Sequence, residues 1–171
     1  MNGNMKNIIR QYEIAEISIR GRMGYAITCI EKIIKFYKAQ TPQIDKLLFF
    51  LWEYTLSIRL DLWEEEFIQM VPESVNDFIK RFDLQFLEDD TCSFIFDILK
   101  EVYEVATGNL HGGYRSTYTE TPLVQIVEKM DSKNIILPAI APFSISKVSE
   151  EHGWGRPIAK SDFLAEIQSC L

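Results

Sequence analysis

The chain has 171 residues, of which 47% are hydrophobic and 12% aromatic, so it can bury one sizeable core and does not have the composition of a disordered chain. Its formal net charge of −7 repels phosphate groups, which argues against nucleic acid and anionic membrane surfaces as partners and favours a basic protein. Three cysteines without CxxC spacing, Cys29, Cys92 and Cys170, indicate reduced thiols in a cytoplasmic protein rather than a disulfide framework.

The acidity is concentrated in the middle of the chain. Residues 1–42 contain seven basic and three acidic residues, residues 43–107 contain five and fifteen, and residues 108–171 contain six and seven. The first residues have no apolar segment typical of a secretory signal, and the longest apolar run, LLFFLW, is far shorter than the ~20 residues of a membrane span. We therefore expect a cytoplasmic protein with an acidic middle section and no part in a membrane.

The first part of the chain has the apolar spacing of amphipathic helices. Apolar residues recur at helical intervals over residues 5–19 and again over residues 23–37, and Gly21 weakens the pattern between them. These intervals predict two helices, or one long helix bent near Gly21. Arg20 and Arg22 fall mainly on the polar side, which predicts that solvent surrounds them.

The stretch from Thr41 to Leu60 is apolar on nearly every side. Thr41 is a good helix cap, and Pro42 suits the first helical position. A helix of this kind is usually buried on most of its surface, so the pattern predicts the core helix of the fold. Asp61 and Glu64 then have the spacing of a capping box, which predicts a new short helix that continues to about Met70.

The second half of the chain contains further helical patterns and a less regular end. Thr121 and Pro122 repeat the helix start seen at residue 41, and Gly108 is a plausible helix end. The segment NIILPAIAPF, residues 134–143, fits either an edge strand or an extended segment across helices. Further helices are expected at residues 73–82, about 91–107, about 122–131, 146–152 and 162–170.

These elements together predict an all-α or nearly all-α fold. We expect one domain over residues 1–171, built as a helical bundle or a short stack of six to eight helices, with an irregular C-terminal third.

Known patterns of catalytic and metal-binding residues are missing from the sequence. The two histidines, His111 and His152, have neither HxxxH spacing nor a CxxC partner, and no GxSxG or phosphate-loop lysine occurs. We predict no catalytic residue, no metal and no cofactor. One alternative stays open, an enzyme that uses His111 with a carboxylate, because the long loop from Gly108 to Pro122 is of a kind that is often functional.

The acidic middle section instead predicts a surface for a basic protein partner. Clustered carboxylates accelerate the encounter with such a partner, and exposed aromatic side chains would anchor it. A helical adaptor that binds a basic cellular protein is the second interpretation. The residues predicted to bind the partner are Asp61, Trp63, Glu64, Glu65, Glu66, Glu88, Asp89, Asp90, Tyr114, Tyr118 and Glu120.

The C-terminal third adds a resemblance to a known class of proteins. Its sequence LPAIAPFSISKVSEEHGWGRPIAKSDF combines a Pro-Phe segment, a short helix, a Gly-Trp-Gly-x-Pro turn around Trp154 and a capped last helix. This pattern, over residues 134–165, resembles immunity proteins of bacterial polymorphic-toxin systems. The resemblance implies a cytoplasmic protein without catalysis that blocks a co-encoded toxin. Trp154 between two glycines is either a core residue that closes a tight turn or an exposed contact residue.

Overall fold

The computed structural model describes residues 11–169, with side chains up to Leu164. Two sequence predictions therefore lie outside the described residues, namely the first part of the helix expected from residue 5 and the end of the last helix at Cys170. In chain order the elements are α2 (Ile19–Tyr37), α3 (Pro42–Glu53), α4 (Leu60–Met70), α5 (Val75–Arg81), α6 (Asp89–Thr107), α7 (Thr117–Ser132), the 3₁₀ helices η1 (Ala141–Ile145) and η2 (Glu151–Gly153), and α8 (Lys160–Ser169).

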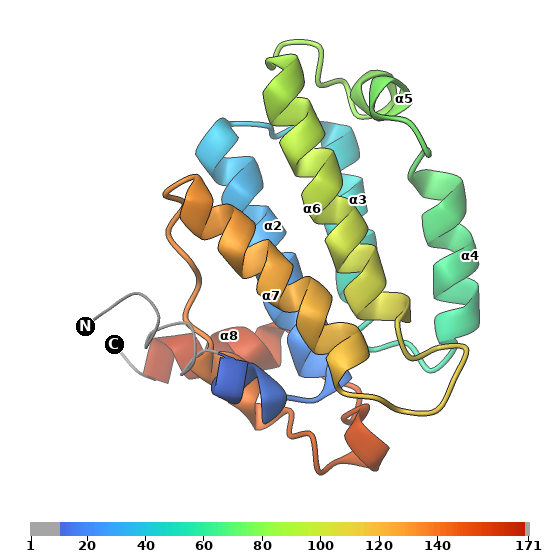
Figure 1. Cartoon of the computed structure of the whole chain (residues 1–171), viewed down its shortest axis with the longest axis vertical. Coiled ribbons are helices and arrows are strands. Elements are labelled where there is room, and N and C mark those ends of the chain that lie inside the picture. Colours follow the sequence, from blue (N-terminus) through green and yellow to red (C-terminus); the bar gives the residue numbers. More distant parts are fainter. Residues whose placement is uncertain (1–10, 170–171) are drawn as a thin grey trace.

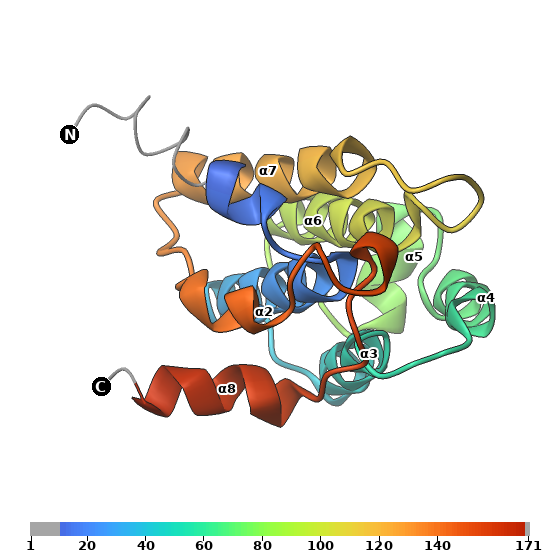
Figure 2. The ribbon, with the colours of Figure 1, turned by 90° about the horizontal axis from the view of Figure 1, so that it is seen from below.

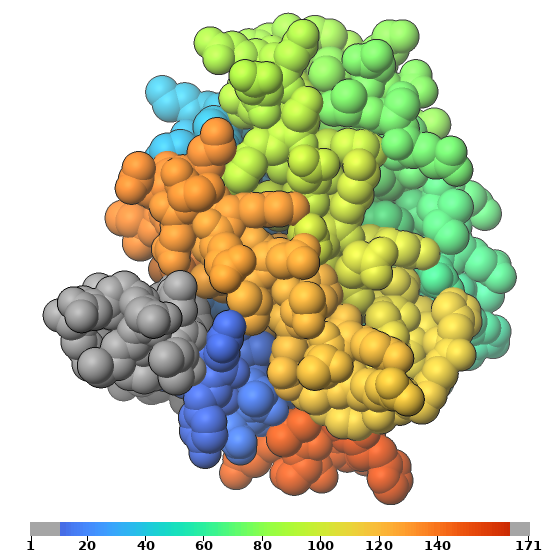
Figure 3. Space-filling model, in the orientation of Figure 1, coloured from blue at the N-terminus to red at the C-terminus, as the bar shows by residue number. Residues whose placement is uncertain are grey.

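The helices surround α2, which is the true centre of the fold. Helix α2 packs against α3, α6, α7 and η1, and it lies between α7 on one side and α8 on the other (Figures 1 and 2). The space-filling view shows α6 and α7 covering one face and hiding most of α2 (Figure 3). No strand occurs among residues 11–169, where the pairing of Ile17 with Lys147 is an isolated bridge. The prediction of an all-α fold is confirmed.

The prediction that residues 41–60 form the core helix is wrong in extent and in burial. Thr41 does cap the helix, since its hydroxyl accepts a hydrogen bond from the Ile44 amide at 3.1 Å, but α3 ends at Glu53. Phe49 is 72% exposed and Ile58 is 84% exposed. The apolar residues of this stretch exceed what the core can cover, so several of them remain on the surface.

The expected bend near Gly21 is also misplaced. The chain breaks earlier, at residues 16–18, and the Ser18 hydroxyl caps α2 by accepting a hydrogen bond from the Gly21 amide. Gly21 lies inside a regular helix, where a Cβ atom would come within 3.1 Å of the Phe143 carbonyl oxygen and 3.2 Å of the Ser146 Cβ. Gly21 therefore permits α2 to cross the C-terminal segment closely rather than bending the helix.

Arg20 and Arg22 are buried, contrary to the prediction that solvent surrounds them. The Arg20 guanidinium donates hydrogen bonds to the carbonyl oxygens of Tyr54, at 2.8 Å, and of Gly155, at 3.1 Å. Arg22 is 0% exposed and bonds the Ser116 carbonyl oxygen at 3.0 Å. Each arginine thus joins the start of α2 to segments far away in the sequence, because a buried guanidinium needs several acceptors.

Helix α4 stands at the edge of the molecule (Figure 1) and is held there by aromatic side chains. The Trp63 ring stacks on Phe50 of α3 with a centroid distance of 5.1 Å. Phe67 in turn stacks on Tyr103 of α6 at 4.8 Å. The proposed capping box at Asp61 is wrong, since α4 begins at Leu60 and has no side-chain cap.

Of two further helix boundaries, one differs from the sequence prediction and one agrees with it. Helix α7 begins at Thr117, so Pro122 lies inside the helix rather than at its first position. Helix α6 ends at Thr107, as the position of Gly108 predicted, but the backbone of Gly108 is not left-handed. A Cβ atom there would lie 2.6 Å from the Tyr118 carbonyl oxygen, so Gly108 is needed for the close approach of α7.

The C-terminal third wraps around the start of α2. Residues 135–139 belong to no helix and pair with no strand among the described residues, and they begin and end at turns, with Asn134 left-handed and Ile140 in the helical region. Trp154 is half-buried and packs against the core, and its carbonyl oxygen accepts a hydrogen bond from the Arg20 amide at 3.1 Å. Gly155 has a φ of 76°, and a Cβ atom there would lie 2.2 Å from the Ser18 hydroxyl oxygen. The Gly-Trp-Gly turn therefore secures the point where α2 begins.

Candidate functional site

Helix α4 has one face turned to the core and one turned to solvent. The inward residues Leu60, Trp63, Glu64, Phe67 and Met70 are buried or half-buried at the helical spacing i, i+3, i+4, i+7. The outward residues are all exposed, and they combine three carboxylates with two large apolar side chains and an amide. This set, named here the acidic face of α4, consists of Asp61, Leu62, Glu65, Glu66, Ile68 and Gln69.

Asp61, at the start of the acidic face, pairs with Arg59, which lies two residues earlier in the chain. Arg59 donates two hydrogen bonds to the Asp61 carboxylate, from Nε at 2.9 Å and from Nη2 at 2.6 Å. The hydrogen bond from Arg59 is the main reason that the pKa of Asp61 is lowered to about 2. Asp61 is therefore charged at neutral pH but largely neutralised by Arg59, which leaves Glu65 and Glu66 as the main source of negative charge on this face.

Glu64 belongs to an internal cluster rather than to the acidic face. The Tyr103 hydroxyl donates to Glu64 Oε1 at 2.9 Å, and His111 Nε2 lies 2.9 Å from Glu64 Oε2. Burial, together with the hydrogen bond to Glu64, raises the pKa of the Tyr103 hydroxyl. The cluster joins α4, α6 and the loop that contains His111.

The enzyme alternative required His111 to lie in a cleft within reach of a carboxylate. Glu64 satisfies the second requirement, but the His111 side chain is 76% exposed. An imidazole in that position stands in bulk water, where neither its proton nor a substrate would be shielded. The contact with Glu64 fastens the loop to α4, and the geometry gives His111 no enclosed site.

The second acidic group lies far from the first. Glu88 occupies the N-cap position of α6 without a side-chain hydrogen bond, and Asp89 and Asp90 occupy its first turn, as predicted for carboxylates at a helix N-terminus. All three are exposed. Helix α6 begins at the top of Figure 1, whereas α4 begins lower, at the side of the molecule, so the two acidic groups belong to different helices and to different parts of the surface.

The remaining residues predicted to contact the partner differ in how far their side chains are exposed. Trp63 is only 4% exposed and belongs to the core, so it is not available as a surface anchor. Tyr118 is 46% exposed on α7, and Tyr114 is 37% exposed, with its ring against Gly153. Glu120 forms an ion pair with buried Arg22 at 3.1 Å, which commits its carboxylate to the interior.

The apolar members of the acidic face are not among the contact residues predicted from the sequence. Leu62 is 48% exposed and Ile68 is 59% exposed. Their helical spacing from Trp63 and Phe67 carried the necessary signal: once those two aromatic residues are placed inward, residues 62 and 68 must point to solvent. The acidic face is therefore also an apolar one.

Metal-binding clusters and membrane-spanning helices are both absent from the part of the chain that the structure describes. No group of three or more His, Cys, Asp or Glu side chains in that part of the chain could hold a metal ion. No helix within residues 11–169 is long and apolar enough to cross a membrane. Cys29 and Cys92 are both buried.

Comparisons with protein-family models, with curated proteins and with solved structures found no match for this chain.

Proposed function

We propose that the chain is an immunity protein that binds a cognate bacterial toxin and neutralises it by covering the toxin's active site with the acidic face of α4. One observation carries this proposal: Glu65 and Glu66 lie beside exposed Leu62 and Ile68 on a helix at the edge of the molecule. Charged groups beside apolar ones are what a protein partner with a basic surface requires. The resemblance of residues 134–165 to immunity proteins supports a bacterial toxin, rather than another basic protein, as the partner.

The two kinds of side chain on the acidic face have different roles in the proposed complex. Glu65 and Glu66 attract a cationic cleft, such as that of a nuclease, and so increase the association rate. Leu62 and Ile68 lose their contact with water on docking and so slow dissociation. Because Trp63 and Phe67 already fix α4 to the bundle, the face needs little ordering when it binds.

The proposal is tested by co-expression with the basic protein encoded beside this chain. The wild type should restore growth to cells that produce the toxin, and the purified pair should form a complex that weakens as salt is added. A chain that neither binds nor protects against any neighbouring gene product would overturn the proposal.

Charge reversal locates the surface. The double variant Glu65→Lys/Glu66→Lys should lose protection while it keeps its fold, because both side chains are exposed and surface substitutions rarely change stability by more than about 0.5 kcal/mol. The matched control is Glu73→Lys/Glu128→Lys, which makes the same change in net charge at exposed positions elsewhere. If the control loses protection as strongly, net charge rather than the acidic face explains the binding.

A helical adaptor for a basic cellular protein is the second candidate, supported by the same face. It predicts the same sensitivity to salt and to the Glu65 and Glu66 reversals, but no protection in any co-expression assay with a neighbouring toxin gene.

A further inference from the structure

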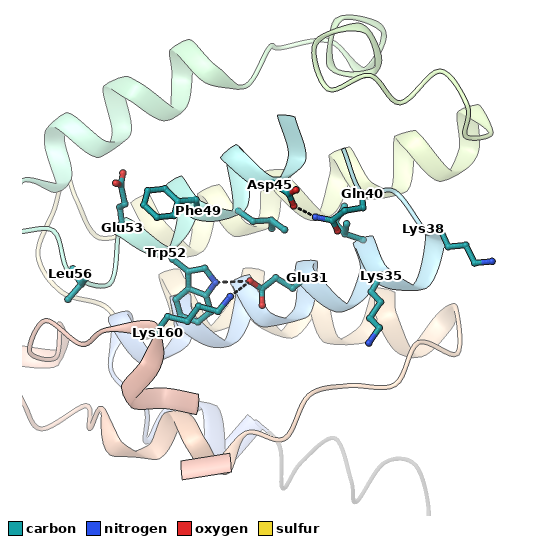
Figure 4. A pocket seen from close by; sticks show the side chains of 12 residues that line it. Glu31, Lys35, Lys38, Gln40, Asp45, Phe49, Trp52, Glu53, Leu56 and Lys160 are labelled. Carbon is teal, nitrogen blue, oxygen red and sulfur yellow. Dashed lines mark hydrogen bonds and ion pairs between the residues drawn. The ribbon is translucent and has the colours of Figure 1, made fainter. Parts of the chain in front are cut away.

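A second feature of the surface, distinct from the acidic face of α4, is an apolar groove between α2 and α3. It has a volume of about 850 Å³ and is open along one side. Figure 4 shows the first residues of α8 closing one part of it. None of the residues that line the groove belongs to the acidic face, so any role of the groove is independent of the function proposed above.

The floor of the groove is apolar and preformed. Leu48, Phe49 and Trp52 of α3 line it together with Leu56. The Trp52 indole is fixed in place, since its Nε1 donates a hydrogen bond to Glu31 Oε1 at 2.9 Å. Because the ring cannot easily turn away, a ligand would meet a ready surface and would not have to order it first.

Phe49 and Leu56 are exposed by 72% and 53%, which is unusual for large apolar side chains at a concave site. Ile58, just beyond Leu56, is 84% exposed. The apolar surface therefore continues past the groove itself. A small molecule held in the groove would leave this continuation in water, whereas a protein segment would cover it.

The two walls of the groove carry charges of opposite sign. Lys35 and Lys38 lie along the α2 margin with their ammonium groups pointing outward, and the carboxylates of Asp45 and Glu53 lie along the α3 margin, where Asp45 also accepts a hydrogen bond from Gln40 (Figure 4). The charges nearest the floor are already paired with each other, because Lys160 Nζ lies 2.6 Å from Glu31 Oε1. A ligand therefore meets an apolar centre with one basic and one acidic margin.

We propose that the groove binds an amphipathic helix of a partner protein, with an apolar stripe flanked by carboxylates on one side and by Lys or Arg on the other. An apolar stripe at i, i+3, i+4, i+7 is the pattern that grooves between helices receive. From Glu31 to Tyr37, its last residue, α2 rises about 9 Å, which is nearly two turns of a bound helix. The carboxylate flank faces Lys35 and Lys38, and the basic flank faces Asp45 and Glu53.

The probe is a fluorescein-labelled designed peptide of about 15 residues, near the length at which an isolated helix becomes stable. It has leucines at the stripe positions, Glu on one flank and Lys on the other. Two further peptides have the same stripe with Glu on both flanks or Lys on both. A helix turned end for end exchanges its flanks, so the mixed peptide fits in one direction, whereas a single-sign peptide meets a like charge in both.

Fluorescence anisotropy of the three peptides with the full chain measures the preference. The mixed peptide should bind at least tenfold more tightly than either single-sign peptide. Phe49→Ala should weaken its binding at least tenfold, while Phe86→Ala, a matched exposed phenylalanine elsewhere that is 60% exposed, should leave it unchanged. The Lys35→Glu/Lys38→Glu variant makes both walls acidic and should transfer the preference to the Lys-flanked peptide.

Several results would overturn the inference. Equal affinity for the three peptides would show that the charged walls do not select the ligand, and an unaltered Phe49→Ala affinity would place binding elsewhere. Tighter binding of dodecanoate, with displacement of the mixed peptide, would make the groove a site for a small amphiphile. Self-association of the chain that Phe49→Ala abolishes would make the occupant a second copy. Loss of toxin protection in the Glu65 and Glu66 variants bears on none of these outcomes.

Discussion

At the scale of single residues, the fold depends most on a charge in its interior. The Arg22 guanidinium, 0% exposed, bonds the carbonyl oxygens of Ile14 at 3.1 Å and Ser116 at 3.0 Å, the Thr119 hydroxyl at 2.8 Å and the Glu120 carboxylate at 3.1 Å. Burial lowers the Arg22 pKa from its ordinary value, and the Glu120 carboxylate opposes that shift. The Arg22 guanidinium is thus a buried positive charge, and the folded chain supplies its hydrogen-bond acceptors.

Arg22→Met should lower the free energy of unfolding by about 3–5 kcal/mol, because it leaves the Glu120 carboxylate and several carbonyl groups without their donor. Urea unfolding measured by circular dichroism gives the change. Arg59→Met is the matched control, since the Arg59 side chain is 61% exposed, and it should cost no more than about 0.5 kcal/mol. Equal effects of the two variants would contradict the role assigned to Arg22.

Because of Tyr54, the free energy of unfolding depends on pH in the alkaline range. Its side chain is fully buried and its hydroxyl donates to the Ala106 carbonyl oxygen at 2.7 Å. Burial raises the Tyr54 pKa far above its ordinary value, although nearby Arg20 opposes the shift. A raised pKa in the folded state means that the stabilising contribution is complete below the unfolded-state pKa near 10 and is lost as the pH rises above it.

The wild type should therefore lose about 1.4 kcal/mol of stability per pH unit above pH 10 through Tyr54 alone. Tyr54→Phe has no proton to release, so its free energy of unfolding should fall by about 1.4 kcal/mol less than that of the wild type between about pH 9 and about pH 11. At neutral pH this variant should be less stable than the wild type by about 1 kcal/mol, because it lacks the hydrogen bond. Urea unfolding at the two pH values measures the difference. A Tyr12→Phe control, at a position that is 70% exposed, should behave as the wild type does.

At the scale of elements, helix types and approximate positions follow from the sequence because they depend on local spacing. The inward stripe of α6 and the Thr41-Pro42 start of α3 are examples, and the structure contains both. Burial does not follow so readily, because it depends on which helices meet. Helix α3 has the more apolar sequence, yet α2 became the centre, since its glycines permit close approach and its arginines find acceptors on three other segments.

In the acidic face, too, exposure follows from local spacing, whereas contacts between distant residues do not. Exposed Glu65 and Glu66 follow from the spacing of α4, as does the position of Asp89 and Asp90 in the first turn of α6. The partners of Glu64 and Glu120 do not, because Tyr103 and Arg22 are distant in the sequence and are brought near only by the packing of α4, α6 and α7.

Gly21 tests whether close packing or helix propensity decides the stability of α2. Propensity alone predicts that Gly21→Ala stabilises the helix by about 1 kcal/mol. The structure predicts the opposite sign, because the new Cβ would lie 2.2 Å from the Ile17 Cγ2 and 3.1 Å from the Phe143 carbonyl oxygen. Overpacking of this kind typically costs about 1–3 kcal/mol.

Thermal unfolding of Gly21→Ala beside Gly112→Ala measures the effect. A Cβ on Gly112 would meet nothing within 4 Å, so that variant should be neutral or slightly more stable. A Gly21→Ala protein more stable than the wild type would show that α2 and the C-terminal segment can separate without cost.

At the scale of the whole molecule, the surface offers two separate faces to other proteins. The acidic face of α4 is on the helix at the edge of the bundle, and the groove with walls of opposite charge lies between α2 and α3 (Figures 1 and 4). The net charge of −7 favours the approach of a basic partner, and the acidic face combines the carboxylates of Glu65 and Glu66 with exposed Leu62 and Ile68 on one helix. We therefore propose this face, rather than the groove, as the place where a toxin binds.

Hydrogen exchange of the chain, free and in complex with the basic protein encoded beside it, tests that claim most directly. We expect complex formation to slow amide exchange over residues 60–70. This change should be lost in Glu65→Lys/Glu66→Lys and kept in the Glu73→Lys/Glu128→Lys control. Slower exchange confined to other segments, with residues 60–70 unchanged in a tight complex, would contradict it.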